Sequence, residues 1–193
     1  MRNFTIYLYL LFFSGGFIYG QSFEGGSGTE ADPWQVATPA QLNLLRNYLA
    51  VYMGESHIDK HFVLVNDIDL SSYLAAGGEG YTMWGDAGWL PIGNWTSHFQ
   101  GSFDGKGFSI KGLKINRPDE EYVGLFRVID KNTIKNIHIV DMDVLGKNKV
   151  GGLVGLIYFN GASIVNSSAK GVISGGTVGL LVGENQGTIE SSY

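Results

Sequence analysis

The chain has 193 residues, enough for one domain, and its 13 basic and 18 acidic residues give a net charge of −5. No basic cluster interrupts this acidic balance, which argues against a nucleic acid or an anionic membrane surface as partner. Cysteine is absent from the sequence, so packing and hydrogen bonds have to hold the fold without disulfides.

The first twenty residues differ in character from the rest. Arg2 precedes a short apolar run over residues 4–13, and Ser14-Gly-Gly16 ends that run. This is the pattern of a secretory signal peptide over residues 1–20. A membrane anchor is the alternative, but the run is far shorter than the ~20 residues that a spanning helix needs. We therefore expect a secreted or cell-surface protein with no membrane span once the signal is removed.

Residues 21–60 are predicted to form a polar, glycine-rich lead-in followed by a helix. Thr38 fits the N-cap of this helix, Pro39 its first position and Gln41 the reciprocal capping partner. Apolar residues then recur at helical spacing, at Leu42, Leu45, Leu49 and Tyr52. The pattern predicts an amphipathic helix that ends near Gly54 and caps the open end of the repeats that follow.

Residues 61–193 repeat themselves. The phrase Val123-Gly-Leu-Phe126 returns 27 residues later as Val150-Gly-Gly-Leu-Val-Gly155, and 28 residues after that as Val178-Gly-Leu-Leu-Val-Gly183. A second, alternating phrase begins at Ile110, Ile134, Ile164 and Ile189. Short alternating runs bounded by Gly, Asn or Ser predict strands, and a period of this length predicts stacked repeats.

We therefore predict an all-β fold, a parallel β-helix (solenoid) with the N-terminal helix as its cap. The four isoleucines should then lie in a single file inside it. A β-sandwich is the rival fold, but it would not require the same phrase to recur at near-constant spacing. Glycines are expected at the corners, and Asn136 and Asn166 should form a hydrogen-bonded ladder there. The structural repeat residues are Gly124, Gly151, Gly152, Gly155, Gly179, Gly183, Asn136 and Asn166.

One repeat carries an insert over residues 71–98. Val65 and Ile110 begin corresponding phrases 45 residues apart, against 24 to 30 for the later gaps, and three of the four tryptophans fall in between. Tryptophan and tyrosine faces stack on sugar rings and anchor protein partners. The candidate binding residues are Trp84, Trp95, Tyr81, Asp86 and Asn94. The alternative is that the insert covers the first repeats with its tryptophans packed beneath, and Trp89 is expected to be structural.

Other polar pairs are weaker candidates. Asp67 and Asp69 lie two apart, as paired acid–base or calcium-binding carboxylates can, but they align with a corner and an outward position. Asp141 and Asp143 have the same spacing, and we interpret them in the same way, as structural and solvated side chains. His57 and His61 are four apart but lack a third ligand. We expect no catalytic residue, no metal and no cofactor.

The repeated phrase resembles the GLUG motif, Gly-Leu-hydrophobic-Gly, in residues 150–155 and 178–183. The lead-in segments that begin at Asp67, Trp89 and Phe99 resemble those that precede such repeats, although Leu180 stands where the motif has its first Gly. The resemblance implies an exported, adhesin-like bacterial protein with a right-handed parallel β-helix. GLUG repeats also occur in IgA-cleaving zinc metalloproteases, whose chemistry lies in a separate domain. This sequence has no His-Glu-x-x-His, so no protease activity is implied.

The sequence therefore predicts an exported or cell-surface, non-catalytic scaffold for adhesion or for binding a glycan or a surface protein. A polysaccharide lyase or glycoside hydrolase is an alternative that rests on fold analogy alone. The chain stops at Tyr193 within a repeat phrase, so a further alternative is the N-terminal, non-catalytic part of a larger surface enzyme. Self-association through an uncapped last repeat is expected in that case.

Overall fold

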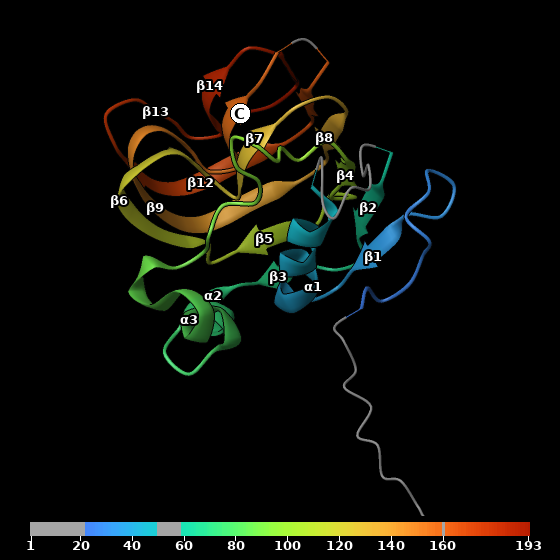
Figure 1. Cartoon of the computed structure of the whole chain (residues 1–193), viewed down its shortest axis with the longest axis horizontal. Helices are drawn as coiled ribbons and strands as arrows, with labels where there is room; N and C mark the ends of the chain where they lie inside the picture. Colours follow the sequence, from blue (N-terminus) through green and yellow to red (C-terminus); the bar gives the residue numbers. More distant parts are fainter. Residues whose placement is uncertain (1–21, 50–58, 160) are drawn as a thin grey trace, which may run out of the picture.

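The structure is a computed structural model that describes residues 22–49, 59–159 and 161–193 (Figure 1). The predicted signal peptide at residues 1–20 lies outside these ranges, as do His57 and the predicted end of the helix near Gly54. None of the helices in the described ranges is long and apolar enough to cross a membrane.

The described chain is built around three parallel sheets (Figure 1). The first sheet contains β1 (Trp34–Val36), β2 (His61–Leu64), β4 (Ser102–Asp104), β8 (Thr133–Lys135), β11 (Ser163–Val165) and β15 (Thr188–Glu190). The second contains β3 (Ile68–Asp69), β5 (Ser109–Lys111), β6 (Lys114–Val123), β9 (His138–Gly151), β12 (Ser168–Ser174) and β13 (Val178–Gly179). The third contains β7 (Phe126–Ile129), β10 (Val154–Ile157) and β14 (Val182–Asn185). The first sheet begins at Trp34, ahead of the predicted start of the repeats at residue 61.

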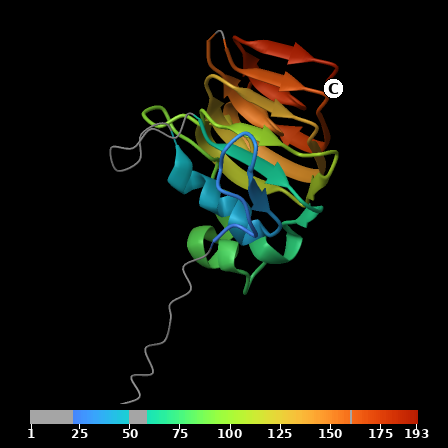
Figure 2. The same cartoon turned by 90° about the vertical axis from the view of Figure 1, so that its right-hand side faces the viewer.

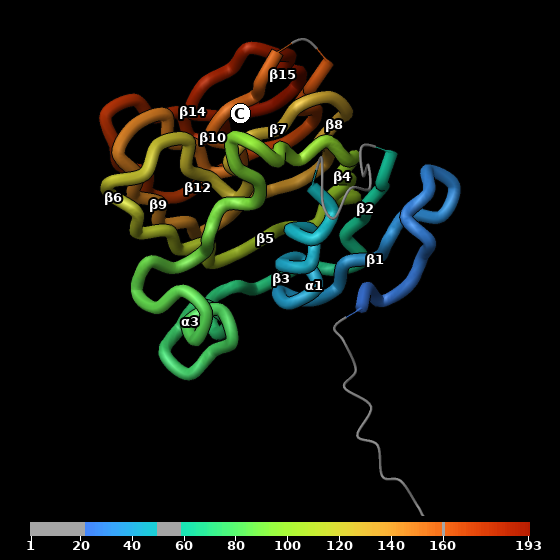
Figure 3. Tube along the Cα trace, in the orientation of Figure 1, coloured from blue at the N-terminus to red at the C-terminus, as the bar shows by residue number. Residues whose placement is uncertain are grey.

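From β4 on, the chain visits the three sheets in turn, so strands one repeat apart lie side by side (Figures 2 and 3). In the first sheet Ile134 pairs in register with Ile164, and Ile164 with Ile189. Phe103 and Phe62 continue the same file towards β2. Alternation puts these residues on one face, and all but Ile189 are buried.

Ile110 does not belong to this file, so that part of the prediction is wrong. Ile110 pairs with Ile68 on one side and Ile139 on the other, in the second sheet. The phrase at Ile110 has the same alternation as the phrase at Ile134, and alternation alone does not tell one sheet from another.

The predicted fold class, an all-β parallel β-helix with an N-terminal capping helix, is also wrong. The described residues are mostly β with short helices, and no closed solenoid is detected among them. The third sheet has three strands against six in each of the others. Before β7, the chain crosses that side through isolated bridges, Ile92 to Phe126 and Phe99 to Ile129. The segment that departs from the pattern is the insert, whose path the repeat period does not determine.

Short helices lie at the end of the sheets away from β15 (Figure 2). α1 (Pro39–Leu44) continues as a 3₁₀ turn, η1 (Leu45–Tyr48), and buries Leu42 and Leu45. The Thr38 side chain accepts a hydrogen bond from the Gln41 N–H at 3.2 Å, so the predicted N-cap is confirmed. The insert supplies α2 (Ser71–Leu74), α3 (Glu79–Trp84) and the 3₁₀ turn η2 (Gly85–Ala87), so α1 is not the only helix at this end.

The corner ladder is present and longer than predicted. Asn166 donates to Asn136 Oδ1 at 2.8 Å, and Asn136 donates to Asp104 Oδ1 at 2.9 Å. Asn136 and Asn166 have φ angles of 53° and 47°, a left-handed conformation that asparagine adopts more readily than most residues. The ladder therefore joins three successive repeats at a corner where the chain turns sharply.

Candidate ligand-binding groove

One part of the insert packs against the rest of the protein through Trp84 and Trp89, and a loop of the insert carries an exposed aromatic, Trp95. Trp89 is buried, and its Nε1–H donates to the Leu125 carbonyl oxygen at 3.1 Å. Its structural role, predicted from the sequence, is thereby confirmed. Trp84 is partly buried and packs edge-to-face on Trp89, with ring centroids 5.3 Å apart. Trp84 thus belongs to the packing beneath the insert.

Trp95 is the exposed aromatic, with 51% of its surface accessible. It lies in a turn that Asn94 closes, because Asn94 Oδ1 accepts hydrogen bonds from the N–H groups of Thr96 and Ser97 at 2.8 and 2.9 Å. The Trp95 ring meets the Tyr122 ring at 4.6 Å and 89°, an edge-to-face contact. The turn and Tyr122 therefore hold the indole in place while leaving much of it open.

Trp95 and Asn94 line a cavity of about 330 Å³ that we call the Trp95 groove. This volume is at the lower end of the range of about 300–1,000 Å³ found for small-molecule sites. Its lining residues are Arg46, Leu49, Leu90, Pro91, Gly93, Asn94, Trp95 and Arg127. Two of the five predicted binding residues are therefore brought together here. Tyr81, in α3, and the exposed Asp86, in η2, are not in the lining, and neither is Trp84.

Arg46 is a cation that sequence analysis missed. It reaches from η1 to the insert, where its guanidinium donates to the Pro91 carbonyl oxygen at 2.9 Å and to the Leu90 carbonyl oxygen. Its Cζ lies 4.8 Å from the ring centroid of Trp89 and 5.1 Å from that of Trp84. Burial lowers the pKa of Arg46 to about 9, so it stays charged at neutral pH. Among the described residues it has no carboxylate partner.

Arg127 and Arg117 share one carboxylate. Arg117 Nη1 lies 2.8 Å from Glu120 Oε1, and Arg127 Nη2 contacts Glu120 Oε2. Burial raises the pKa of Glu120, but hydrogen bonds and charge from the two arginines outweigh it and lower the pKa overall. Glu120 is therefore ionised at neutral pH. Among the described residues, this region holds three guanidinium groups and one carboxylate that pairs with them.

Sheet register places Arg127 between glycines. Phe126 pairs with Val154, and Val154 with Val182, so the next residues along, Arg127, Gly155 and Gly183, lie side by side. The bridge between Ile92 and Phe126 places Gly93 on the other side of Arg127. Arg127 thus has glycines on both sides and is the one side chain in this row. The signal in the sequence was that an arginine stands where the later copies of the phrase end in glycine.

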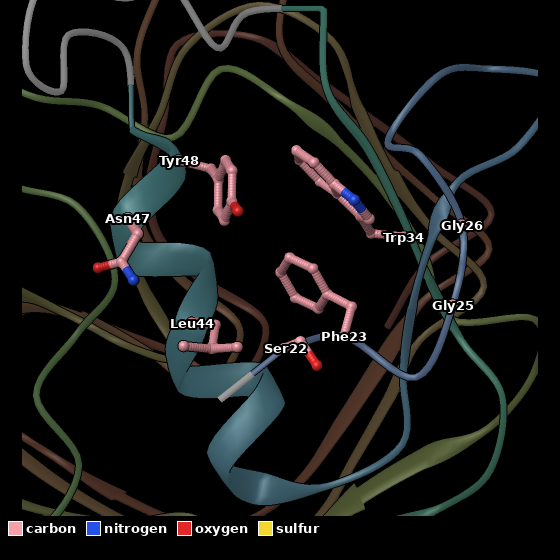
Figure 4. A pocket seen from close by; sticks show the side chains of 8 residues that line it. All are labelled: Ser22, Phe23, Gly25, Gly26, Trp34, Leu44, Asn47 and Tyr48. Carbon is pink, nitrogen blue, oxygen red and sulfur yellow. The ribbon is translucent and has the colours of Figure 1, made fainter. Parts of the chain in front are cut away.

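A second cavity, of about 250 Å³, lies beside α1 (Figure 4). The rings of Phe23, Trp34 and Tyr48 point toward one another there. Trp34 lies 5.2 Å from Phe23 and 4.4 Å from Tyr48, measured between ring centroids. At these separations the rings pack against each other and leave no room for a ligand between them. We interpret this cluster as packing of the lead-in onto β1.

Three of the four carboxylates in the pairs considered from the sequence have partners among the described residues, and the fourth, Asp143, is exposed. Asp67 Oδ1 accepts from the Ser109 N–H at 2.7 Å, and Asp69 Oδ1 from the Ser71 N–H at 2.8 Å. Asp141 is exposed and lies 3.8 Å from the Lys111 ammonium. In the described part of the chain, no group of three or more His, Cys, Asp or Glu side chains is placed to hold a metal ion.

Comparison with known proteins gives two sequence relatives. No protein-family model matches the chain. The chain is 36% identical over 161 residues to a "Putative Gly-rich membrane protein" of Evansella cellulosilytica, a match covering 83% of this chain and 17% of that protein. It is 34% identical over 163 residues to "Halomucin" of Haloquadratum walsbyi, covering 82% of this chain and 2% of that protein. The chain therefore spans less than a fifth of the length of either relative.

Among solved structures, the chain is similar to one described as "a putative immunoglobulin A1 protease from Bacteroides ovatus". The TM-score is 0.43 with 15% sequence identity, and the match covers 89% of this chain and 77% of that one.

Proposed function

We propose that this chain acts at the cell surface as a non-catalytic scaffold that binds glycans through the Trp95 groove. The location is supported by the predicted signal peptide and by relatives named as a membrane protein and as halomucin. The observation that carries the binding role is the exposed indole of Trp95, which lines the groove and makes an edge-to-face contact with Tyr122.

The groove offers what a sugar ring needs. An indole face stacks on the C–H face of a sugar, and its position is fixed in advance by the Asn94 turn and by Tyr122. The hydrogen bonds that Asn94 makes with other described residues use its Oδ1, so within that part of the chain its Nδ2 remains a donor beside Trp95. A hydroxyl acceptor on the sugar can take that donor.

The lining favours binding over cleavage. Glycoside hydrolysis uses a pair of carboxyl groups across the scissile bond, and the eight residues that line the Trp95 groove include neither Asp nor Glu. We therefore favour a binding module over the lyase or hydrolase alternative.

A glycan array tests the proposal with the purified protein and two variants. Trp95→Ala removes the stacking face, and we expect it to lose most of the signal on the glycans that the wild type binds. Phe159→Ala is the matched control, because Phe159 is also an exposed aromatic, at 57%, but is not in the lining. A protein that binds no glycan on the array, or a Trp95→Ala variant that binds as well as wild type, would contradict the proposal.

A further inference from the structure

The Trp95 groove has a charge that the proposed function does not use. The whole chain carries −5, yet Arg46 and Arg127 both line this cavity and Arg117 lies close by. Glu120 pairs with Arg117 and Arg127, and Arg46 has no carboxylate partner in the described residues. The groove is therefore a locally cationic site on an acidic protein.

Resting on the proposed function, we propose that the Trp95 groove selects anionic saccharides. The sugar ring lies on Trp95, and its acidic group, a carboxylate or a sulfate, binds the guanidinium groups of Arg46 and Arg127. Guanidinium groups recognise such oxyanions through charge-assisted and often bidentate hydrogen bonds.

Both arginines keep donors for a ligand. Within the described residues, Arg46 uses three of its five N–H groups, one each to Asn43, Pro91 and Leu90. Arg127 uses two, to the Glu121 carbonyl oxygen at 2.8 Å and to Glu120. The protein contacts fix both guanidinium groups in place, so a ligand does not have to pay for ordering them.

A purely structural role is the competing explanation, because the three arginines also join neighbouring segments: Arg46 bonds the insert from η1, Arg117 bonds the insert from β6, and Arg127 bonds β6 from β7. Arg117 provides the means to separate the two. Arg117 Nε donates to the Trp89 carbonyl oxygen at 3.2 Å and pairs with Glu120, as Arg127 does, but Arg117 does not line the groove. If the arginines act only as structural clamps, loss of Arg117 and loss of Arg127 should change saccharide binding to a similar extent. If Arg127 contacts the ligand, only the loss of Arg127 should change binding.

The test measures affinity by isothermal titration calorimetry with three probes. These are a trimer of galacturonic acid, its carboxyl-reduced neutral counterpart and a sulfated galactose trimer. We expect wild type to bind one or both acidic probes about tenfold or more tightly than the neutral one, the factor that one charge-assisted hydrogen bond supplies. The two acidic probes distinguish a carboxylate ligand from a sulfate ligand.

Variants then locate the preference. Arg127→Gln should bring the acidic probes to within about threefold of the neutral one, while Arg117→Gln, with the same change in net charge, keeps the preference. Arg127→Lys should recover part of it. If Arg127→Gln does not fold, the wild type still decides, because the preference should fall as salt rises while neutral binding stays constant.

Each outcome has a separate meaning. Equal binding of neutral and acidic probes overturns the anionic preference and leaves the glycan-binding function standing. Loss of the preference in Arg117→Gln as well would also overturn it, since the charge of the region and not the groove would then be responsible. If no saccharide binds here or on the array, the proposed function fails and this inference fails with it.

Discussion

Gly155→Ala should destabilise the fold far more than an ordinary glycine-to-alanine change. A Cβ on Gly155 would lie 2.3 Å from the carbonyl carbon of Tyr122 and 2.5 Å from its oxygen. Carbon atoms in contact normally lie about 3.5–4.0 Å apart, so backbone would have to move by more than about 1 Å. Overpacking costs about 1–3 kcal/mol, and a clash with backbone belongs at the upper end. We therefore expect a loss of about 3 kcal/mol, which is about 6–12 °C in Tm for a chain of this size.

The assay is urea and thermal unfolding followed by circular dichroism, with Gly176→Ala as the matched control. A Cβ on Gly176 would meet Asn148 Oδ1 and the Lys147 carbonyl oxygen, both at 3.2 Å, which is 0.9 Å farther than the nearest atom at Gly155, and Gly176 does not have positive φ. The control should change the free energy of unfolding by no more than about 0.5 kcal/mol. If Gly155→Ala proves as stable as Gly176→Ala, the close approach of successive repeats is not what requires this glycine.

Three further changes test other contacts. Asn136→Ala should lower the free energy of unfolding, measured by urea titration, by about 1 kcal/mol more than Asn136→Gly does. Both variants lose the hydrogen bonds of the ladder, but only alanine is strained at the φ of 53°. Equal losses in the two variants would contradict this. Trp89→Phe should cost about 2 kcal/mol, from a small cavity and the hydrogen bond to Leu125, and a cost below about 0.5 kcal/mol would refute the role of that contact. Burial raises the pKa of Asp104, but hydrogen bonds from Asn136 and the Lys106 N–H, with the Lys106 charge, outweigh it and lower the pKa overall. The ionised Asp104 therefore stabilises the fold above its unfolded-state pKa of about 4, and this stabilisation is lost as the pH falls through its lower folded-state pKa. Asp104→Asn should make the free energy of unfolding decline less steeply below about pH 4. An unchanged slope of unfolding free energy against pH would count against this.

The strands were predictable where one phrase recurs unchanged. Ile134, Ile164 and Ile189 occupy the same place in the alternating pattern, and the parallel pairing of β8, β11 and β15 brings them into register. Ile110 was misassigned because its phrase resembles theirs while it lies in another sheet. The path of residues 71–98 was not predictable, since its helices and bridges are determined by packing on Trp89 and Arg46 and not by any repeat.

The groove was predictable only in part, for a similar reason. The sequence shows an aromatic next to an asparagine, at Trp95 and Asn94, but it left open whether Trp95 is exposed or packed beneath the insert. Arg46 and Arg127 are far apart in the sequence and meet at the groove only through tertiary packing and sheet register. The one local signal was Arg127 itself, which stands where Gly155 and Gly183 stand in the later copies.

The same row of residues links the fold to the groove. Gly155 and Gly183 are small because a neighbouring backbone lies directly against each, that of Tyr122 and that of Lys149. Arg127 departs from this rule and projects into the groove beside Gly93. A slip of one residue in the pairing of β7 with β10 would turn Arg127 to the opposite face. Register therefore determines both which glycines the fold requires and which cation the groove presents, and a change that loosens pairing between these strands should weaken anionic ligand binding before it unfolds the chain.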